Sequence, residues 1–115
     1  MILREAASKL GIGISLMIGL SASAQASSDY CKDLIYNHGL ASSAQFTCGY
    51  EFYNDNVIRD AKQCMAQAVK DGDDSELSSI MKDGFMEFKI LYEEAPAPYK
   101  VCTKFVKDFP SFVQP

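Results

Sequence analysis

Four cysteines constrain this chain more than any other feature of its sequence. The 115 residues include Cys31, Cys48, Cys64 and Cys102. No two of them form the C-x-x-C pair used in redox and zinc sites, and there is no C-x-x-C-H sequence for haem attachment. An even set of cysteines without such motifs predicts two structural disulfides in an oxidising compartment. Three pairings are possible, and the lower cost of closing short loops weakly favours Cys31–Cys48 with Cys64–Cys102.

The N-terminus predicts export. Basic Arg4 and Lys9 precede an uncharged, mostly apolar run of 11 residues, 10–20, and the small residues of SASAQA follow. This order is typical of a cleavable secretory signal peptide, and the run is too short for a membrane span, which needs about 20 apolar residues. We expect a signal peptide over residues 1–26, cut after Ala26, and a single domain over residues 27–115.

The remaining composition is that of a small, acidic globular domain. Residues 27–115 retain nine basic and fourteen acidic side chains, a formal net charge of −5. An acidic balance argues against nucleic-acid binding, which requires a basic surface. All 13 Tyr and Phe residues of the chain lie in this part. Bulky aromatics and disulfides both help a small domain that buries only about 60–65% of its unfolded surface.

Apolar spacing predicts an all-α fold, a small bundle of four to five helices crosslinked by two disulfides. A short helix from Ser28 should stop at Gly39, with His38 in its last turn. Asn54 or Asp55 should cap a second helix ended by Asp71-Gly72, and Asp73 with Glu76 resembles a capping box that starts a third. A fourth should begin near Pro98 and end before Pro110. The expected buried positions of these last three helices are Val57, Ile58, Ala61, Cys64, Met65, Ala68, Val69, Leu77, Ile80, Met81, Gly84, Phe85, Phe88, Leu91, Tyr92, Val101, Cys102, Phe105, Val106 and Phe109.

Gly84 and residues 41–53 do not follow from apolar spacing alone. Gly84 lies on an apolar stripe, so we expect it to permit close helix contact rather than to break the helix. Residues 41–53 fit both strand and helix spacing. Since no second strand is evident, we expect an irregular or partly helical segment held by Cys48.

Catalytic and metal-binding motifs are weak. The acidic group at residues 71–76 fails the calcium-loop pattern, because its sixth and twelfth positions are Glu76 and Lys82 instead of Gly and Glu. His38 is the only histidine, and no G-x-S-x-G turn is present. We therefore expect no catalytic residues, no metal and no cofactor.

The best candidate for a binding surface is aromatic. Four rings lie close to Cys48, at Phe46, Tyr50, Phe52 and Tyr53. Aromatic side chains on a rigid support dominate protein-binding hot spots, although the same rings could close the core of a small bundle. The tail at residues 109–112 poses the same question.

These observations favour a small, non-catalytic protein of the periplasm or the secreted space that binds a protein partner. It would act as an inhibitor or immunity protein does, and its negative charge would attract a basic partner. An alternative is an acid- or envelope-stress chaperone that opens at low pH and exposes Phe85, Phe88 and Phe105. A small enzyme is the third and weakest hypothesis.

Overall fold

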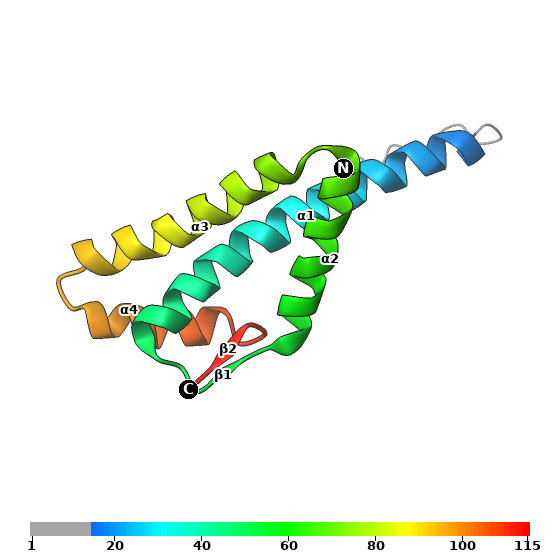
Figure 1. The fold of residues 1–115 in the computed structure, drawn as a ribbon. Helices are drawn as coiled ribbons and strands as arrows, with labels where there is room; N and C mark the ends of the chain where they lie inside the picture. The colour runs from blue at the N-terminus through cyan, green and yellow to red at the C-terminus, as the bar shows by residue number, and fades with distance from the viewer. Residues whose placement is uncertain (1–14) are drawn as a thin grey trace. The chain divides into compact units, whose positions relative to one another are not determined.

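The computed structural model describes residues 15–115, with side chains from Asp29 onward (Figure 1). Its elements are α1 (Ser15–Cys48), β1 (Phe52–Tyr53), α2 (Asp55–Asp71), α3 (Asp74–Glu94), α4 (Pro98–Asp108) and β2 (Val113–Gln114). Four helices and two disulfides confirm the predicted all-α bundle. The first fourteen residues of the expected signal peptide lie outside the described residues. The packed domain comprises Cys31–Pro115, and α1 is considered below from Cys31 on.

The predicted end of the first helix at Gly39 is wrong, because α1 continues to Cys48. A glycine inside a helix costs about 1 kcal/mol relative to alanine, yet Gly39 is buried against the backbone of Met81 on α3. Packing therefore outweighs the local preference. The role predicted for Gly39 falls to Gly49, which has a φ of +68° and donates its N–H to the Gln45 carbonyl at 2.9 Å.

Gly84 forms the other half of the contact between α1 and α3. A Cβ at this position would overlap the carbonyl oxygen of Tyr36 on α1, as a Cβ at Gly39 would overlap that of Met81. The two helices thus approach closely because each presents a glycine to the backbone of the other. This confirms the sequence interpretation of Gly84.

The ends of the shorter helices follow mostly from local chemistry. The Asn54 side chain accepts a hydrogen bond from the N–H of Asn56 at 2.9 Å, as an N-cap should. Gly72 closes α2 in the left-handed conformation, with φ +79°, and Pro98 occupies the first turn of α4. The capping box is not formed. The Asp73 side chain makes no cap hydrogen bond, and Glu76 instead lies 3.4 Å from Lys32.

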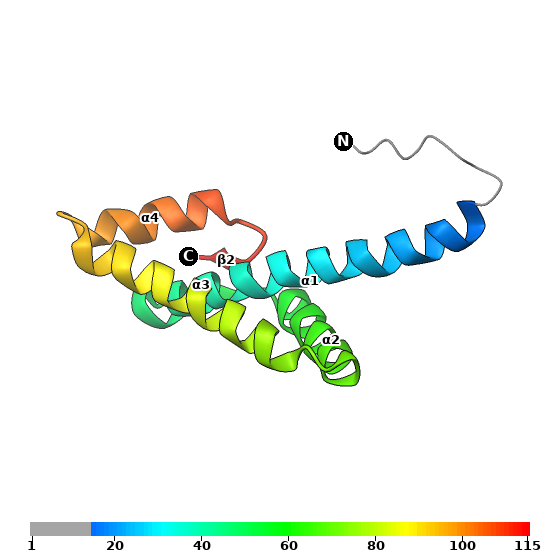
Figure 2. The same cartoon turned by 90° about the horizontal axis from the view of Figure 1, so that it is seen from above.

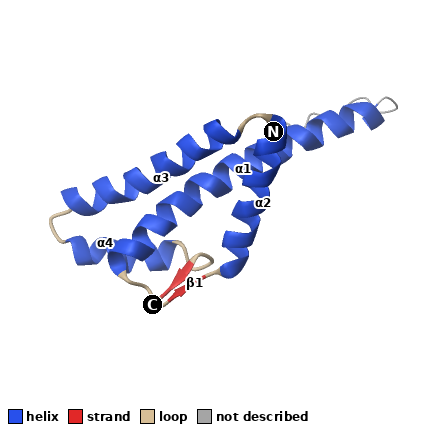
Figure 3. Cartoon of the chain, in the orientation of Figure 1, coloured by secondary structure: helices blue, strands red, loops and turns tan. Residues whose placement is uncertain are grey.

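Two short strands complete the fold. Residues 41–53 are partly helical and held by Cys48, as predicted, but the segment ends in a strand that the sequence did not predict. Residues up to Cys48 are helical, whereas Phe52 and Tyr53 pair antiparallel with Gln114 and Val113 (Figure 3). The partner strand lies about sixty residues downstream, so no hairpin pattern reveals it. The C-terminal tail consequently docks on the bundle, with Val113 fully buried.

The core has two parts. One centres on Phe88 and Phe105, whose rings meet edge to face with centroids 5.4 Å apart, and it includes the half-buried Cys48 and Cys102. The other centres on Ile35 and includes Cys31 and Cys64. Three side chains predicted to be buried are instead exposed, at Val69, Phe85 and Leu91.

The disulfides join Cys31 to Cys64 and Cys48 to Cys102, so the favoured pairing was wrong. Continuity of α1 explains the error. Cys31 and Cys48 lie 17 residues apart on one helix, which places them about 25 Å apart along its axis. A disulfide requires Cα atoms within about 7 Å. Each cysteine of α1 therefore bonds to another helix, Cys31 to α2 and Cys48 to α4.

Non-reducing peptide mapping should recover crosslinked peptides for Cys31–Cys64 and Cys48–Cys102. The double variants Cys31→Ala/Cys64→Ala and Cys48→Ala/Cys102→Ala should each lose about 4 kcal/mol of unfolding free energy, because each bridge closes a long loop in the unfolded chain. Urea unfolding measures this loss. A Cys31–Cys48 peptide from native protein would contradict a continuous α1.

The variant Gly84→Ala tests the close contact between α1 and α3. Overlap with the Tyr36 backbone should cost about 1–3 kcal/mol of stability or more, despite a gain of about 1 kcal/mol in helix preference. Ser79→Ala, at an exposed position of the same helix, should stay within about 0.5 kcal/mol of wild type. Stabilisation by Gly84→Ala in thermal or urea unfolding would show that the helices do not approach as described.

Candidate partner-binding surface

The four aromatic residues predicted to form a binding surface do not all lie at the surface of the domain. Tyr50 and Tyr53 point into the domain, whereas Phe46 and Phe52 are 85% and 49% exposed. The structure thus divides the candidate segment between core and surface. Each pair is positioned by different contacts.

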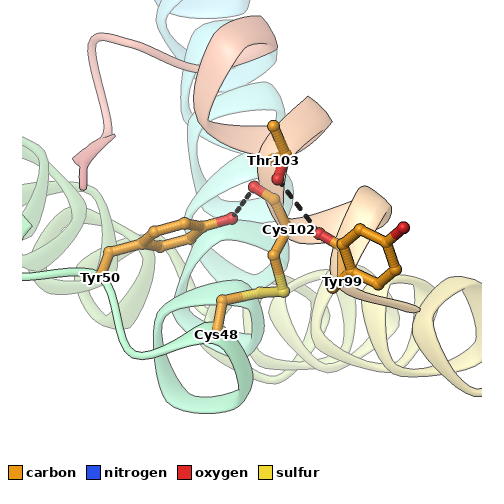
Figure 4. Close-up of a disulfide and its surroundings, with 5 residues drawn as sticks. All are labelled: Cys48, Tyr50, Tyr99, Cys102 and Thr103. Atoms are coloured by element: carbon orange, nitrogen blue, oxygen red, sulfur yellow. Dashed lines mark hydrogen bonds between the residues drawn. A yellow bond between two sulfur atoms is a disulfide. The ribbon is translucent and has the colours of Figure 1, made fainter. Parts of the chain in front are cut away.

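Tyr50 belongs to the core, which the sequence left open as the alternative to a binding surface. Only 9% of it is accessible, and its ring stacks with that of Phe105 at a centroid distance of 6.3 Å. Its hydroxyl donates to the carbonyl oxygen of Cys102 at 2.6 Å, directly beside the Cys48–Cys102 disulfide (Figure 4). Burial raises the pKa of the Tyr50 hydroxyl. Tyr50 therefore fastens the chain after α1 to α4.

Tyr53 is half-buried and fastens β1 to α1 through His38. Its hydroxyl lies 2.7 Å from His38 Nδ1, and the two rings meet edge to face. Burial raises the pKa of Tyr53 to about 12, with a hydrogen bond to Ser42 acting in the opposite direction. The phenol therefore stays protonated, and its hydroxyl also donates to the carbonyl oxygen of His38 at 3.5 Å.

His38 was expected in a last helical turn, but it lies ten residues before the end of α1. Burial lowers the pKa of its imidazole below the usual 6.5. One ring nitrogen is occupied by Tyr53. These contacts give His38 a structural role, because its ring and its carbonyl oxygen both contact Tyr53 and hold β1 in place.

Phe46 and Phe52 form the part of the candidate segment that a partner can reach, and we call this pair the aromatic edge. Phe46 is the most exposed large apolar side chain among the described residues. It lies four residues beyond Ser42 and eight beyond His38, so it continues the side of α1 that contacts Tyr53. Cys48 follows two residues later and ties this turn of α1 to α4. An exposed ring is thus held on a crosslinked frame.

Sequence periodicity missed a second group of exposed apolar side chains, on the C-terminal half of α3. Met86, Ile90 and Leu91 are 42%, 47% and 51% exposed. Leu91 was assigned to the buried stripe, whereas Met86 and Ile90 fell outside it. The sequence could have revealed Met86 and Ile90 by their position off the buried stripe. Apolar residues outside the core face of a helix are exposed if no other element covers them.

Within the described part of the chain, no group of three or more His, Cys, Asp or Glu side chains is arranged to hold a metal ion. Residues 71–76 are all exposed, and their acidic side chains lie around the turn between α2 and α3. A helix N-terminus favours such acidic residues electrostatically.

Comparison with protein-family models, with curated proteins and with solved structures finds no match for this chain. Among the described helices, none combines the length and the apolar character needed to cross a membrane. The two disulfides suit an oxidising, extracellular-type environment. The functional argument therefore depends on the surfaces described above.

The burial of His38 predicts a pH-dependent stability. Because its pKa is lower in the folded state, the unfolded chain binds the proton first as pH falls below about 6.5, and stability decreases. Urea unfolding at pH 7.5 and 5.5 should show this decrease, and it should be absent in His38→Gln. This pH range lies above the usual pKa of carboxyl groups, about 4, so their titration contributes little to the decrease. An equal decrease in His38→Gln would assign the effect to other groups.

Proposed function

We propose that this protein is a small exported, non-catalytic protein that binds another protein through the aromatic edge. The observation that carries the proposal is Phe46, which is 85% exposed and lies two residues before Cys48 of the Cys48–Cys102 disulfide. Large aromatic side chains are enriched in binding hot spots, where they enter a pocket of the partner. A rigid support lowers the entropy lost on binding.

Charge and the N-terminal sequence support the rest of the proposal. The predicted signal peptide over residues 1–26 would direct the chain to the periplasm or the secreted space. The formal charge of −5 over residues 27–115 favours a basic partner through long-range attraction. An inhibitor or immunity protein has this kind of role, in which contact alone produces the effect.

The chaperone alternative has less support from the contacts. It requires Phe88 and Phe105 to become exposed at low pH, but these rings pack in the core beside the Cys48–Cys102 disulfide, which holds the end of α1 against α4. Binding of an apolar dye at pH 2–3 distinguishes the hypotheses. Strong dye binding there would favour the chaperone.

Capture of partners from the envelope fraction of the source cells, or from host secretions, tests the proposed function. Wild type should retain a protein that Phe46→Ser/Phe52→Ser releases, because an interface hot spot is worth at least about 2 kcal/mol of binding. Val69→Ser is the matched control, since Val69 is 62% exposed on α2 and away from the aromatic edge.

Fold stability must be unchanged for this comparison to report on binding. Phe46→Ser should unfold within about 0.5 kcal/mol of wild type because the ring is exposed. Equal capture by wild type and Phe46→Ser/Phe52→Ser would refute a role for the aromatic edge in binding.

A further inference from the structure

The C-terminal half of α3 carries an exposed stripe that combines acidic and apolar side chains. Asp83, Glu87, Ile90 and Glu94 recur at intervals of four, three and four residues, which places them along one side of the helix. Met86 and Leu91 flank this line on either side. All six residues are exposed. We call them the α3 stripe.

α4 runs beside the C-terminal half of α3 (Figure 2) and α1 packs against Gly84, while the six residues of the α3 stripe stay exposed. Single exposed apolar residues are common on soluble proteins and need no explanation. Met86, Ile90 and Leu91 are different, because three large side chains that are 42–51% exposed fall within six residues of one helix. This cluster of apolar side chains makes the surface a candidate contact site.

The charge of the α3 stripe has one sign. Lys82 and Lys89 belong to the same helix and lie outside the acidic line, beside Met86 at the margin of the stripe, because Met86 is four residues after Lys82 and three before Lys89. The ion pairs among the described side chains, Lys32–Glu76, Arg59–Asp60 and Lys104–Asp108, use none of the stripe's carboxylates. Its negative charge is therefore available to a partner.

The negative charge of the α3 stripe also acts on a side chain of α1. Tyr36, which lies beside Gly84, has its hydroxyl pKa raised first by burial and then by the charges of Glu87 and Asp83. The two carboxylates thus lie near enough to act together at one point. Their charge is concentrated at the edge of the apolar side chains.

We propose that the α3 stripe binds a basic, amphipathic segment of a protein partner. Apolar side chains of that segment would cover Met86, Ile90 and Leu91, and its Lys or Arg side chains would pair with the surrounding carboxylates. This inference rests on the proposed function and adds a second contact surface and the chemical class of its partner.

The sign of the charge selects this occupant over three others. Anionic lipid headgroups and nucleic-acid phosphates would be repelled by Asp83, Glu87 and Glu94. A second copy docked symmetrically through the same face would set these carboxylates against one another. A basic protein segment satisfies both the apolar and the charged parts of the stripe.

A direct test uses a fluorescent, Leu- and Lys-based amphipathic helical peptide as the probe, with a Glu-for-Lys peptide as its counterpart. The purified, oxidised protein should bind the basic peptide and not the acidic one. Met86→Ser/Ile90→Ser should weaken binding at least tenfold, whereas Val69→Ser should not change it. Asp83→Asn/Glu87→Gln should reduce the salt dependence of the affinity.

Methyl-labelled Met and Ile residues locate the contact by NMR. Addition of the basic peptide should shift Met86 and Ile90, while Met65 and Ile58 of α2 serve as internal references. Absence of binding, equal binding by Met86→Ser/Ile90→Ser, or shifts confined to α2 would overturn the proposal. Self-association of wild type that Met86→Ser/Ile90→Ser abolishes would assign the stripe to a second copy and would also overturn it.

The two binding surfaces can fail separately. Phe46→Ser/Phe52→Ser should leave peptide binding at the α3 stripe unchanged. If captured partners depend on the aromatic edge but not on Met86 and Ile90, the α3 inference fails and the proposed function stands. If neither pair of residues affects capture, both fail.

Discussion

The close contact between α1 and α3 is the constraint on which the rest of this domain depends. Gly39 contacts the backbone of Met81, and Gly84 contacts that of Tyr36. The backbone of each helix thus fills the space that a side chain at the other helix's glycine would need. Protein interiors tolerate little overlap, and this contact admits no larger residue on either side without a shift of the helices. It also keeps α1 continuous through a glycine, and that continuity separates Cys31 from Cys48 and sends each to a different helix.

The separation of the two cysteines explains why the core has two parts. Cys31 and Cys64 belong to the cluster around Ile35, and Cys48 and Cys102 to the cluster around Phe88 and Phe105. A domain of this size gains limited stability from burial alone. One covalent bond at each part restricts the unfolded chain over sequence separations of 33 and 54 residues. The Tyr50–Cys102 and Tyr53–His38 hydrogen bonds then fix the short segment that leaves α1.

Local chemistry allowed much of this fold to be predicted from the sequence, and long-range contacts account for the errors. Asn54, Gly72 and Pro98 mark helix ends because their side chains or backbone freedom act within a few residues. The apolar stripe identified Gly84 as a packing position, whereas only its contact with Met81 on the opposite helix shows that Gly39 is one too. The strand pair could not be predicted, because Tyr53 and Val113 are brought together by the whole bundle. The favoured disulfide pairing rested on loop length alone, and it failed because α1 continues past Gly39 to Cys48.

The candidate site was predictable in composition but not in its division between core and surface. Phe46, Tyr50, Phe52 and Tyr53 are equally aromatic in sequence, and the two tyrosines turn inward because their hydroxyls find buried acceptors at Cys102 and His38. The two phenylalanines remain exposed, although neither carries a polar group that burial would leave unpaired. On α3 the reverse holds, since periodicity placed Leu91 in the core and only the packing leaves it exposed beside Ile90. Both groups of apolar side chains stay in water on a twice-crosslinked frame, and the binding proposed above would remove them from it.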